Sequence, residues 1–317
     1  MKVAVLIPCY NEELTIGKVI DDFKHELPES DIYVYDNNST DKTKVIATEK
    51  GVHVVEERRQ GKGNVVRSMF FDIDADYYIM VDGDDTYPAE AARDLLEPLI
   101  NGEADMTIGD RLSNGAYEDE NKRAFHNFGN NLVRNLINRL YKSNINDIMT
   151  GYRGFNKLFV RSFPIASAGY EIETEMSIHS LDKRFKVKEL PIDYRDRPSG
   201  SESKLNTFSD GFKVIKTIFT LFKDYKPLEF FSIWAGFLTL LGLIAGVPVI
   251  LEFLRFHYIY KVPSAILAVG LVMMAMLSLV CGLILDTVVN NARKQYEVDL
   301  HQIHESLKRE REQVMKG

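Results

Sequence analysis

The sequence has little cysteine, little tryptophan and a deficit of positive charge. Its 317 residues include one tryptophan and two cysteines, Cys9 and Cys281, which lie far apart in the chain. Two cysteines so separated exclude the disulfide framework of a small secreted domain. Lys and Arg number 39 against 46 Asp and Glu, for a formal net charge of −7. We therefore expect no nucleic-acid partner, because a phosphate backbone requires a basic surface.

A recognisable secretory signal is also missing from the amino terminus. The first apolar run, residues 3–7, is only as long as a strand and leads to Asn11, Glu12 and Glu13 rather than to a cleavage site. We therefore expect no signal peptide. The remaining composition, with 45% hydrophobic and 27% charged residues, is ordinary for a globular protein and predicts one large domain with appendages.

Charge is entirely absent from two stretches in the carboxyl-terminal third, residues 230–251 and residues 262–285. Each reaches the length of about 20 residues that a helix needs to cross a bilayer. We expect a two-helix transmembrane hairpin over residues 229–289, with a short exposed loop at residues 252–261. The alternative is a hairpin buried in a soluble core, which uncharged runs of this length disfavour.

Basic residues flank the expected hairpin unevenly. Those on the side of the two termini are Lys223, Lys226, Arg293 and Lys294, and those on the other side are Arg255 and Lys261. Because cytoplasmic flanks carry the excess of Lys and Arg, we expect a two-span protein of the cell membrane whose amino-terminal domain and both termini are cytoplasmic. The last segment, residues 290–317, is rich in charge and predicts a cytoplasmic helix.

An amphipathic segment, residues 206–228, precedes the first uncharged stretch. Its apolar residues at helical spacing are Phe208, Phe212, Ile215, Phe219 and Phe222, with lysines elsewhere around the turn. A helix of this pattern next to a membrane span can lie in the interface, with its apolar face in lipid and its lysines at anionic headgroups. Amphipathicity is equally compatible with a helix that packs on the preceding domain, so both readings stay open.

The amino-terminal two thirds alternate between strand-like and helix-like segments. Runs rich in Val, Ile and Tyr occur at residues 3–7, 32–35, 52–55, 77–81 and 106–108. This alternation predicts an α/β domain over residues 1–205, with a mostly parallel sheet covered by helices on both faces. Ligands of such sheets bind at the carboxyl ends of the strands, which is where the polar loops of this sequence fall.

Three carboxylates follow the fourth of these runs directly. Residues 79–88 read Ile-Met-Val-Asp-Gly-Asp-Asp-Thr-Tyr-Pro, which places Asp82, Asp84 and Asp85 at a strand end. Clustered carboxylates need a neutralising cation, and hard oxygen ligands suit Mg²⁺ or Mn²⁺, which also bind phosphate oxygens. The alternative is an acidic turn that caps a helix starting at Pro88.

Three further loops carry polar residues at strand ends. The first two strands deliver Pro8, Tyr10, Asn11, Glu12 and Asp36, and residues 58–64 contain the triplet Gly61-Lys62-Gly63. Two glycines beside Lys62 allow the backbone and the ammonium group to approach an anion. Each loop alone is also compatible with ordinary turn chemistry.

In this order and spacing, the four loops resemble those of family-2 glycosyltransferases with the GT-A fold. Within that family they are similar to the polyprenyl-phosphate branch, which includes dolichol-phosphate mannose synthase-like enzymes and bacterial two-span membrane proteins. The resemblance covers about residues 1–225. It implies a nucleotide-sugar site formed by Pro8, Tyr10, Asn11, Glu12, Asp36, Lys62, Asp82 and Gly83.

The resemblance also implies a site for Mg²⁺ or Mn²⁺ formed by Asp82, Asp84 and Thr86. In the family, a glutamine two residues after the second aspartate can help to bind the metal. This chain has Thr86 at that position, so either Asp85 or Thr86 would substitute for the glutamine. Asp84 is then expected to be essential for catalysis.

On the acceptor side, residues 147–153 are similar to the family's segment between the donor and acceptor sites, and residues 194–206 resemble its flexible acceptor loop, which closes over the donor. The cations that we expect around the phosphates of the two substrates are Arg111, Arg153, Arg197 and Lys204, because arginine matches phosphate oxygens with a planar fork. Catalytic roles are expected for Asp147 and Arg153, with Asp147 as an orienting group or base because Gly151 stands where some relatives carry an aspartate. Glu171, Glu173 and Glu175 open a helix and either line the site or serve the helix dipole.

The expected reaction is an inverting sugar transfer from a nucleotide diphosphate sugar to polyprenyl phosphate, such as undecaprenyl phosphate, for cell-envelope glycans. The resemblance favours UDP-glucose or UDP-N-acetylglucosamine as donor. A phosphate monoester is already anionic near neutral pH, so a general base is not strictly needed. The alternatives are a family-2 glycosyltransferase that acts on a saccharide or protein, and a non-catalytic membrane scaffold. A homo-oligomer is compatible with the sequence.

Overall fold

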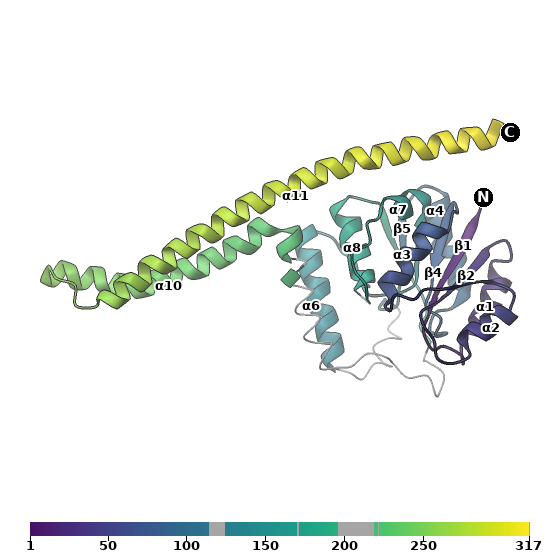
Figure 1. Ribbon diagram of the computed structural model, residues 1–317, viewed down its shortest axis with the longest axis horizontal. Helices are drawn as coiled ribbons and strands as arrows, with labels where there is room; N and C mark the ends of the chain where they lie inside the picture. The colour runs from purple at the N-terminus through teal and green to yellow at the C-terminus, as the bar shows by residue number, and fades with distance from the viewer. Residues whose placement is uncertain (114–123, 170, 196–218, 221, 317) are drawn as a thin grey trace. The chain divides into compact units, whose positions relative to one another are not determined.

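We analysed a computed structural model of the protein, which describes residues 1–113, 124–169, 171–195, 219–220 and 222–316. The chain divides into two compact units (Figure 1). One unit comprises residues 1–214 together with residues 299–317, and the other comprises residues 215–298.

In the part of the chain that the structure describes, seven strands form one sheet in the first unit, in the order β3-β2-β1-β4-β6-β5-β7. The strands are β1 (Val3–Cys9), β2 (Asp31–Asp36), β3 (His53–Glu56), β4 (Tyr77–Met80), β5 (Met106–Asp110), β6 (Arg153–Asn156) and β7 (Val187–Pro191). All neighbours pair in parallel except β6, which runs antiparallel to both β4 and β5. The predicted α/β fold with a mostly parallel sheet is confirmed.

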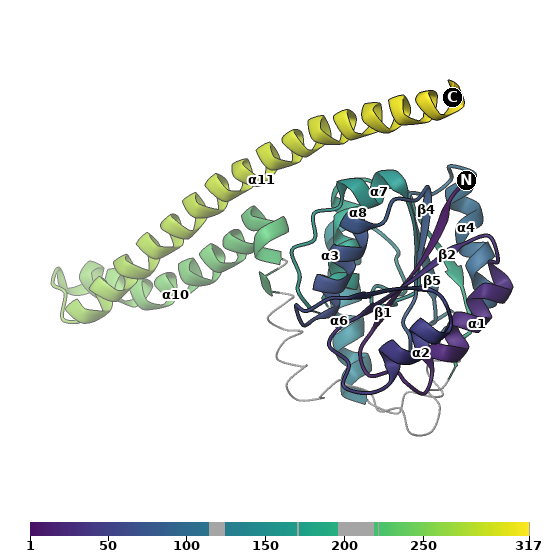
Figure 2. The same ribbon diagram turned by 45° about the vertical axis from the view of Figure 1, so that its right-hand side comes forward.

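Helices cover both faces of this sheet (Figure 2). They are α1 (Ile16–Glu26), α2 (Thr43–Glu49), α3 (Lys62–Asp72), the 3₁₀ turn η1 (Ala89–Ala91), α4 (Ala92–Ile100), α6 (Ala124–Tyr141), α7 (Lys157–Ser162) and α8 (Ile172–Asp182). Helices α1, α2 and α4 lie on one face, and α3, α7 and α8 lie on the other. The amphipathic pattern of α1 explains its place, because Ile16, Val19, Ile20 and Phe23 recur at helical spacing and are all buried.

The core on this face of the sheet is formed by buried side chains from both strands and helices. Alternate residues of β1, beginning with Val3 and Val5, pack against α1 and α4, as the period-two geometry of a strand requires. Because both faces of β1 are covered, every residue from Val3 to Ile7 is buried. The polar loop at the carboxyl end of β1 is therefore attached to a strand that is buried on both faces.

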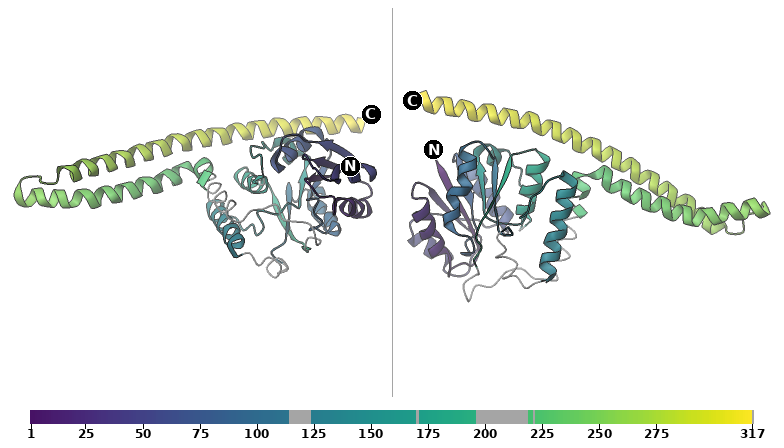
Figure 3. Two further views of the ribbon diagram at one scale, coloured as in Figure 1. Left: turned by 60° about the horizontal axis from the view of Figure 1, so that its bottom comes forward. Right: turned by 180° about the vertical axis from the view of Figure 1, so that it is seen from behind.

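The second unit contains a helical hairpin, α10 (Pro227–Phe256) and the first part of α11 (Val262–Lys316). Both helices are long and apolar enough to cross a membrane, as the uncharged stretches predicted. They run side by side (Figures 1 and 3) and meet through small residues. A Cβ added to Gly242 would lie 2.9 Å from Val272 Cγ2, and one added to Gly282 would lie 2.9 Å from Phe231 Cβ. Glycine thus permits the close approach of the two helices.

Most of the amphipathic segment at residues 206–228 lies outside the described residues. Of its predicted apolar positions, Phe219 and Phe222 are described, and their rings contact the ring of Phe230 at centroid distances of 4.7 and 5.6 Å. The charged tail predicted after the hairpin is helical and continuous with the second apolar stretch in α11.

Candidate active site

The loops that follow β1 and β2 are tied together by hydrogen bonds. The Asn11 amide donates to Ser39 Oγ at 2.9 Å, and the Thr40 amide donates to Asn11 Oδ1 at 2.8 Å. The Glu12 amide donates to Thr43 Oγ1 at 2.8 Å. Asn11 has a φ of 54°, a left-handed conformation that asparagine tolerates better than most residues. These contacts fix the polar loop that carries Pro8 and Tyr10, both half-buried.

Asp36, at the end of β2, has one buried carboxylate oxygen that accepts no hydrogen bond from the described residues. Its side chain is buried, and Oδ2 accepts the Ser39 amide at 3.2 Å. Among the described residues, Oδ1 has no hydrogen-bond partner although it is buried. A buried acceptor without a donor is costly, so this oxygen suits an N–H or O–H group of a ligand such as a nucleoside.

The acidic loop after β4 packs against the loop after β1. Thr15 Oγ1 donates to the Gly83 carbonyl at 2.7 Å. A Cβ on Gly83 would lie 2.7 Å from Cys9 Sγ, so a larger residue would push the loops apart. The contact places Asp82 and Asp84 beside the β1 loop, at the carboxyl ends of neighbouring strands.

The two residues considered as substitutes for glutamine have different surroundings. Thr86 is 1% exposed, and its hydroxyl donates to Asp84 Oδ1 at 2.7 Å. Thr86 therefore orients Asp84. Asp85, with a φ of 58°, instead forms an ion pair with Lys18 at 2.7 Å. Its carboxylate is committed to this pair, so the structure does not support Asp85 as a metal ligand.

The donor set at this loop fits a divalent cation shared with a substrate. No three His, Cys, Asp or Glu side chains come together as a metal cluster among the described residues. Asp82 and Asp84 supply hard carboxylate oxygens, and Mg²⁺ in particular is commonly held by one or two carboxylates, with phosphate oxygens and water completing its coordination. The residues therefore suit a cation that a bound diphosphate helps to hold.

Lys62 is the cation that lies beside Asp82 in the structure. Its ammonium group forms ion pairs with Asp82 Oδ1 and Glu173 Oε1. Burial by itself would lower the pKa of Lys62, but the two carboxylates outweigh it and raise the pKa above its usual value. Burial also raises the pKa of Glu173, against the opposing effect of Lys62. No sequence pattern pairs Lys62 with Glu173, because α3 and α8 meet only through tertiary packing.

The glycines beside Lys62 have a structural role that the sequence did not reveal. A Cβ on Gly61 or on Gly63 would lie 2.1 Å from a carbonyl oxygen, that of Ala168 or Ser167 respectively. The amides of Gly63 and Asn64 donate to the carbonyls of Gly169 and Ala168. These amides at the start of α3 are occupied within the protein, so the anion-cradle interpretation of the Gly-Lys-Gly triplet is not supported.

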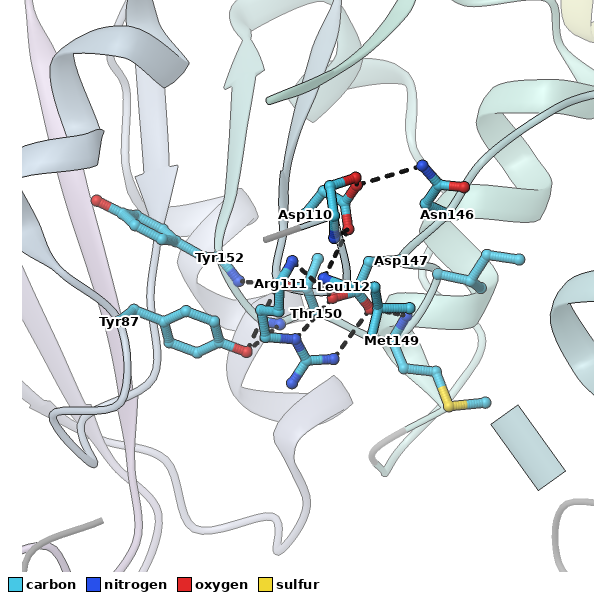
Figure 4. Close-up of polar contacts among 12 residues, drawn as sticks. Tyr87, Asp110, Arg111, Leu112, Asn146, Asp147, Met149, Thr150 and Tyr152 are labelled. Atoms are coloured by element: carbon cyan, nitrogen blue, oxygen red, sulfur yellow. Dashed lines mark hydrogen bonds and ion pairs between the residues drawn. The ribbon is translucent and has the colours of Figure 1, made fainter. Parts of the chain in front are cut away.

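Arg111 and Asp147 form a bidentate ion pair (Figure 4). The Arg111 Nε and Nη2 atoms lie 2.7 and 2.9 Å from the two carboxylate oxygens. The guanidinium carbon lies 5.9 Å from the ring centroid of Tyr87 and 5.4 Å from that of Tyr194. Asp147 is fully engaged by Arg111, so its role is to orient that arginine, and the structure does not support Asp147 as a base.

Tyr87 and Gly151 connect this pair to the acidic loop. The Gly151 amide donates to the Tyr87 hydroxyl at 3.0 Å. A Cβ on Gly151 would lie 2.3 Å from Asp82 Oδ2. Gly151 is thus needed for the close approach of its segment to Asp82, which also explains why an aspartate would not fit at this position. Neither Tyr87 nor this use of Gly151 was predicted, although Tyr87 directly follows the acidic motif.

Arg153 requires a correction. The sequence predicted it beside a substrate phosphate, but its side chain is fully buried. Its Nε donates to the Thr150 carbonyl at 3.0 Å, and its Nη2 donates to the Ile148 carbonyl at 2.6 Å. Burial lowers the pKa of Arg153 to about 10. Arg153 therefore supports the 148–150 loop from inside the domain. The other two predicted acceptor cations, Arg197 and Lys204, lie outside the described residues.

Comparison with known proteins decides the family. Residues 4–163 match the family model described as glycosyl transferase family 2. The chain is a family-2 glycosyltransferase. This family-2 glycosyltransferase is 32% identical over 297 residues to glycosyltransferase AglJ of Haloferax volcanii, which covers 92% of this chain and 95% of the relative.

Two further similarities bear on the family-2 domain. A protein of Haloferax volcanii named dolichyl-phosphate hexose transferase is 30% identical over 215 residues, which is 68% of this chain and 91% of the relative. The crystal structure of Mycobacterium tuberculosis glucosyl-3-phosphoglycerate synthase superposes with a TM-score of 0.56 at 21% identity, over 70% of this chain and 80% of that one. The second likeness shows the shared GT-A-type fold.

Proposed function

We propose that this glycosyltransferase moves one sugar from a nucleotide diphosphate sugar to the phosphate of a membrane polyprenol, with inversion at the anomeric carbon. The assignment of a lipid acceptor rests on one observation: the chain joins a family-2 domain to two helices that are long and apolar enough to cross a bilayer. The similarity to a protein named dolichyl-phosphate hexose transferase supports the same acceptor class. A lipid acceptor explains why the catalytic domain carries a hairpin of this kind.

In the proposed reaction, an anionic oxygen of the lipid phosphate attacks the anomeric carbon. The new carbon–oxygen bond forms as the bond to the nucleoside diphosphate breaks. Since a phosphate monoester has its second pKa near about 6, the nucleophile is already deprotonated at neutral pH. The task of the protein is then alignment of the two substrates and stabilisation of the leaving group.

The donor end is assigned to the loops after β1, β2 and β4. Asp36 Oδ1 accepts a hydrogen bond from the nucleoside, and the Pro8–Glu12 loop, fixed by Asn11, forms the adjoining wall. Asp82 and Asp84 would hold Mg²⁺ or Mn²⁺, which when bound supplies positive charge to the departing diphosphate. Lys62 adds a fixed ammonium group at the same end.

The acceptor end is assigned to Arg111. Its guanidinium is held by Asp147 and lies near two tyrosine rings, which together fix its orientation. Arg111 lies near the ring of Tyr87, whose hydroxyl accepts the Gly151 amide, and Gly151 in turn approaches Asp82 closely. These contacts connect the arginine to the acidic loop after β4. Arg197 and Lys204 belong to the same proposal on sequence grounds alone.

The proposed donors are UDP-glucose and UDP-N-acetylglucosamine, and the proposed acceptor in the cell is undecaprenyl phosphate. We further propose that α10 and the first part of α11 span the cell membrane, with the catalytic domain and both termini in the cytoplasm. The flanking Lys and Arg residues support this orientation.

The test is a transfer assay with the full chain purified in detergent. A panel of radiolabelled nucleotide sugars is supplied with undecaprenyl phosphate and Mg²⁺ or Mn²⁺. We expect label in an organic-soluble product that mild acid hydrolyses, from one donor of the panel. Label on a saccharide or protein instead would favour a different acceptor class, and absence of transfer from every donor would overturn the proposal.

A further inference from the structure

The ion triad Lys62–Asp82–Glu173 contains a carboxylate, that of Glu173, to which the proposed donor site assigns no role. Lys62 and Glu173 have side chains only 8% and 6% exposed, while Asp82 is 28% exposed. One ammonium group therefore serves two carboxylates, of which only Asp82 opens to solvent. A second carboxylate buried without its own counter-charge is expensive, so a function is the natural explanation for its position.

We propose that Glu173 is a positioning residue of the donor site, which acts through Lys62 to keep Asp82 able to bind a divalent cation. This proposal rests on the proposed function, because it assumes that Asp82 faces a metal-bound diphosphate. An ammonium group paired with Asp82 alone would neutralise that carboxylate. Because Glu173 shares the ammonium, the one positive charge of Lys62 is divided between two carboxylates, and Asp82 retains an attraction for a cation.

The geometry favours this role over a helix-dipole role for Glu173. Glu173 lies in the first turn of α8, but its carboxylate is paired with the ammonium of Lys62. Its neighbour Glu175 lies in the same turn and accepts the amides of Ala166 and Ser167 at 2.9 and 2.8 Å. Glu173 also acts electrostatically on Arg153, but that guanidinium is held by the carbonyls of Ile148 and Thr150. Lys62 is therefore the group through which Glu173 reaches Asp82.

The charge argument predicts opposite effects for different substitutions. In Glu173→Gln, Lys62 pairs with Asp82 alone and neutralises it, so cation binding should weaken by roughly 10–100-fold, the usual cost of losing a group behind a metal ligand. In the double variant Lys62→Met with Glu173→Gln, Asp82 stands alone with its own charge. Its cation binding should return toward that of the wild type.

The experiment measures UDP binding to the full chain in detergent by isothermal titration calorimetry at a series of Mn²⁺ concentrations. The quantity compared is the Mn²⁺ concentration that half-saturates UDP binding. We expect it to rise by about 10–100-fold in Glu173→Gln, to stay near the wild-type value in Glu173→Asp, and to fall back in the double variant. Glu175→Gln is the matched control, with the same substitution in the same turn, and should lower the melting temperature without this shift.

Equal Mn²⁺ requirements in Glu173→Gln and the wild type would overturn the proposal. So would a double variant that is no better than Glu173→Gln, or wild-type UDP binding that does not depend on Mn²⁺. If Glu173→Gln does not fold, Glu173→Ala, which also removes the carboxylate, takes its place in the same comparison with the wild type and with the double variant. The assay needs no acceptor, so failure to glycosylate polyprenyl phosphate would overturn the proposed function while leaving this result to stand for the donor site.

Discussion

At the scale of single residues, the candidate site pairs buried cations with carboxylates. Arg111 faces Asp147, and Lys62 faces Asp82 and Glu173. Buried ion pairs contribute little net stability, because desolvation offsets much of their attraction. Their concentration at the carboxyl ends of the strands is better explained by a need for fixed charges where phosphates bind.

The sequence singled out Arg111, Asp147, Lys62 and Asp82 as site residues, but it did not reveal which of them pair. Asp82 and Lys62 each belong to a recognisable loop, whereas Glu173 of α8 meets Lys62 of α3 only in the folded domain. Arg153 was placed at a phosphate because it matches a family motif, and arginines are rarely fully buried. Nothing local in the sequence distinguishes this buried arginine from the substrate-facing kind.

Asp84→Asn is expected to lower sugar transfer by at least about 10²-fold, comparable to the loss of a transition-state charge stabiliser. The substitution removes a carboxylate charge without changing volume, and an asparagine oxygen still accepts the Thr86 hydroxyl, so the fold should be kept. The measurement is initial rate at saturating Mg²⁺ or Mn²⁺, with the melting temperature as a check. Asp94→Asn, at an exposed position of α4, is the control. Wild-type turnover by Asp84→Asn would exclude it as a metal ligand.

Substitutions of Arg111 and Arg153 should differ in their effect on the transfer rate per folded molecule. Arg111→Gln is expected to reduce the rate per folded molecule by roughly 10²-fold if its guanidinium faces a phosphate, and also to lower stability because the buried Asp147 loses its counter-charge. Arg153→Gln should instead lower the free energy of unfolding by roughly 2–4 kcal/mol, because buried carbonyls lose their donors. Rates per folded molecule and urea unfolding curves distinguish the two. Lys42→Gln, on an exposed lysine, is the control, and equal small losses at Arg111 and Lys42 would mean that Arg111 is not at the acceptor.

At the scale of elements, the sequence predicted the five strands that carry apolar runs and missed the other two. The missed strand β6 (Arg153–Asn156) is four residues long and contains Arg, Gly and Asn, which are uncharacteristic of a strand. The missed strand β7 (Val187–Pro191) lies at the edge of the sheet and carries Lys188 and Glu189. Both are defined by their neighbours, since β6 fills the space between β4 and β5, and edge strands commonly carry charge.

The helical hairpin supplies a prediction at the same scale. Gly242→Leu should loosen the contact between α10 and α11, because even a Cβ would lie 2.9 Å from Val272 Cγ2 and 3.4 Å from the Ala268 carbonyl oxygen. We expect a lower melting temperature in detergent and faster proteolysis of the hairpin. Gly270→Leu is the matched control, since an added Cβ there meets nothing within 4 Å. Equal stability of the two variants would show that small residues do not determine the packing.

At the scale of the whole molecule, the uncharged stretches and the loop motifs predict different parts of the same activity. In the proposed function, the loops form a donor site that needs no membrane, and the hairpin gives access to an acceptor that is confined to a bilayer. The sequence allows the two parts to be predicted separately because hydropathy and loop chemistry are both local signals.

Truncation after Lys226 tests this division. It removes both apolar helices and the carboxyl-terminal residues of the first unit, including the ion pair between Lys157 and Glu310, and it keeps every loop motif. The remaining domain should bind UDP in the presence of metal, measured by calorimetry. Transfer to undecaprenyl phosphate in vesicles should fall steeply, because anchoring supplies the effective concentration of the catalytic domain at the bilayer surface. Transfer to a short, water-soluble isoprenyl phosphate should fall much less.

If the truncated domain glycosylates the long acceptor as fast as the full chain does, the hairpin does not serve acceptor access. Either residues 206–226 then provide the membrane contact or the acceptor is not a lipid.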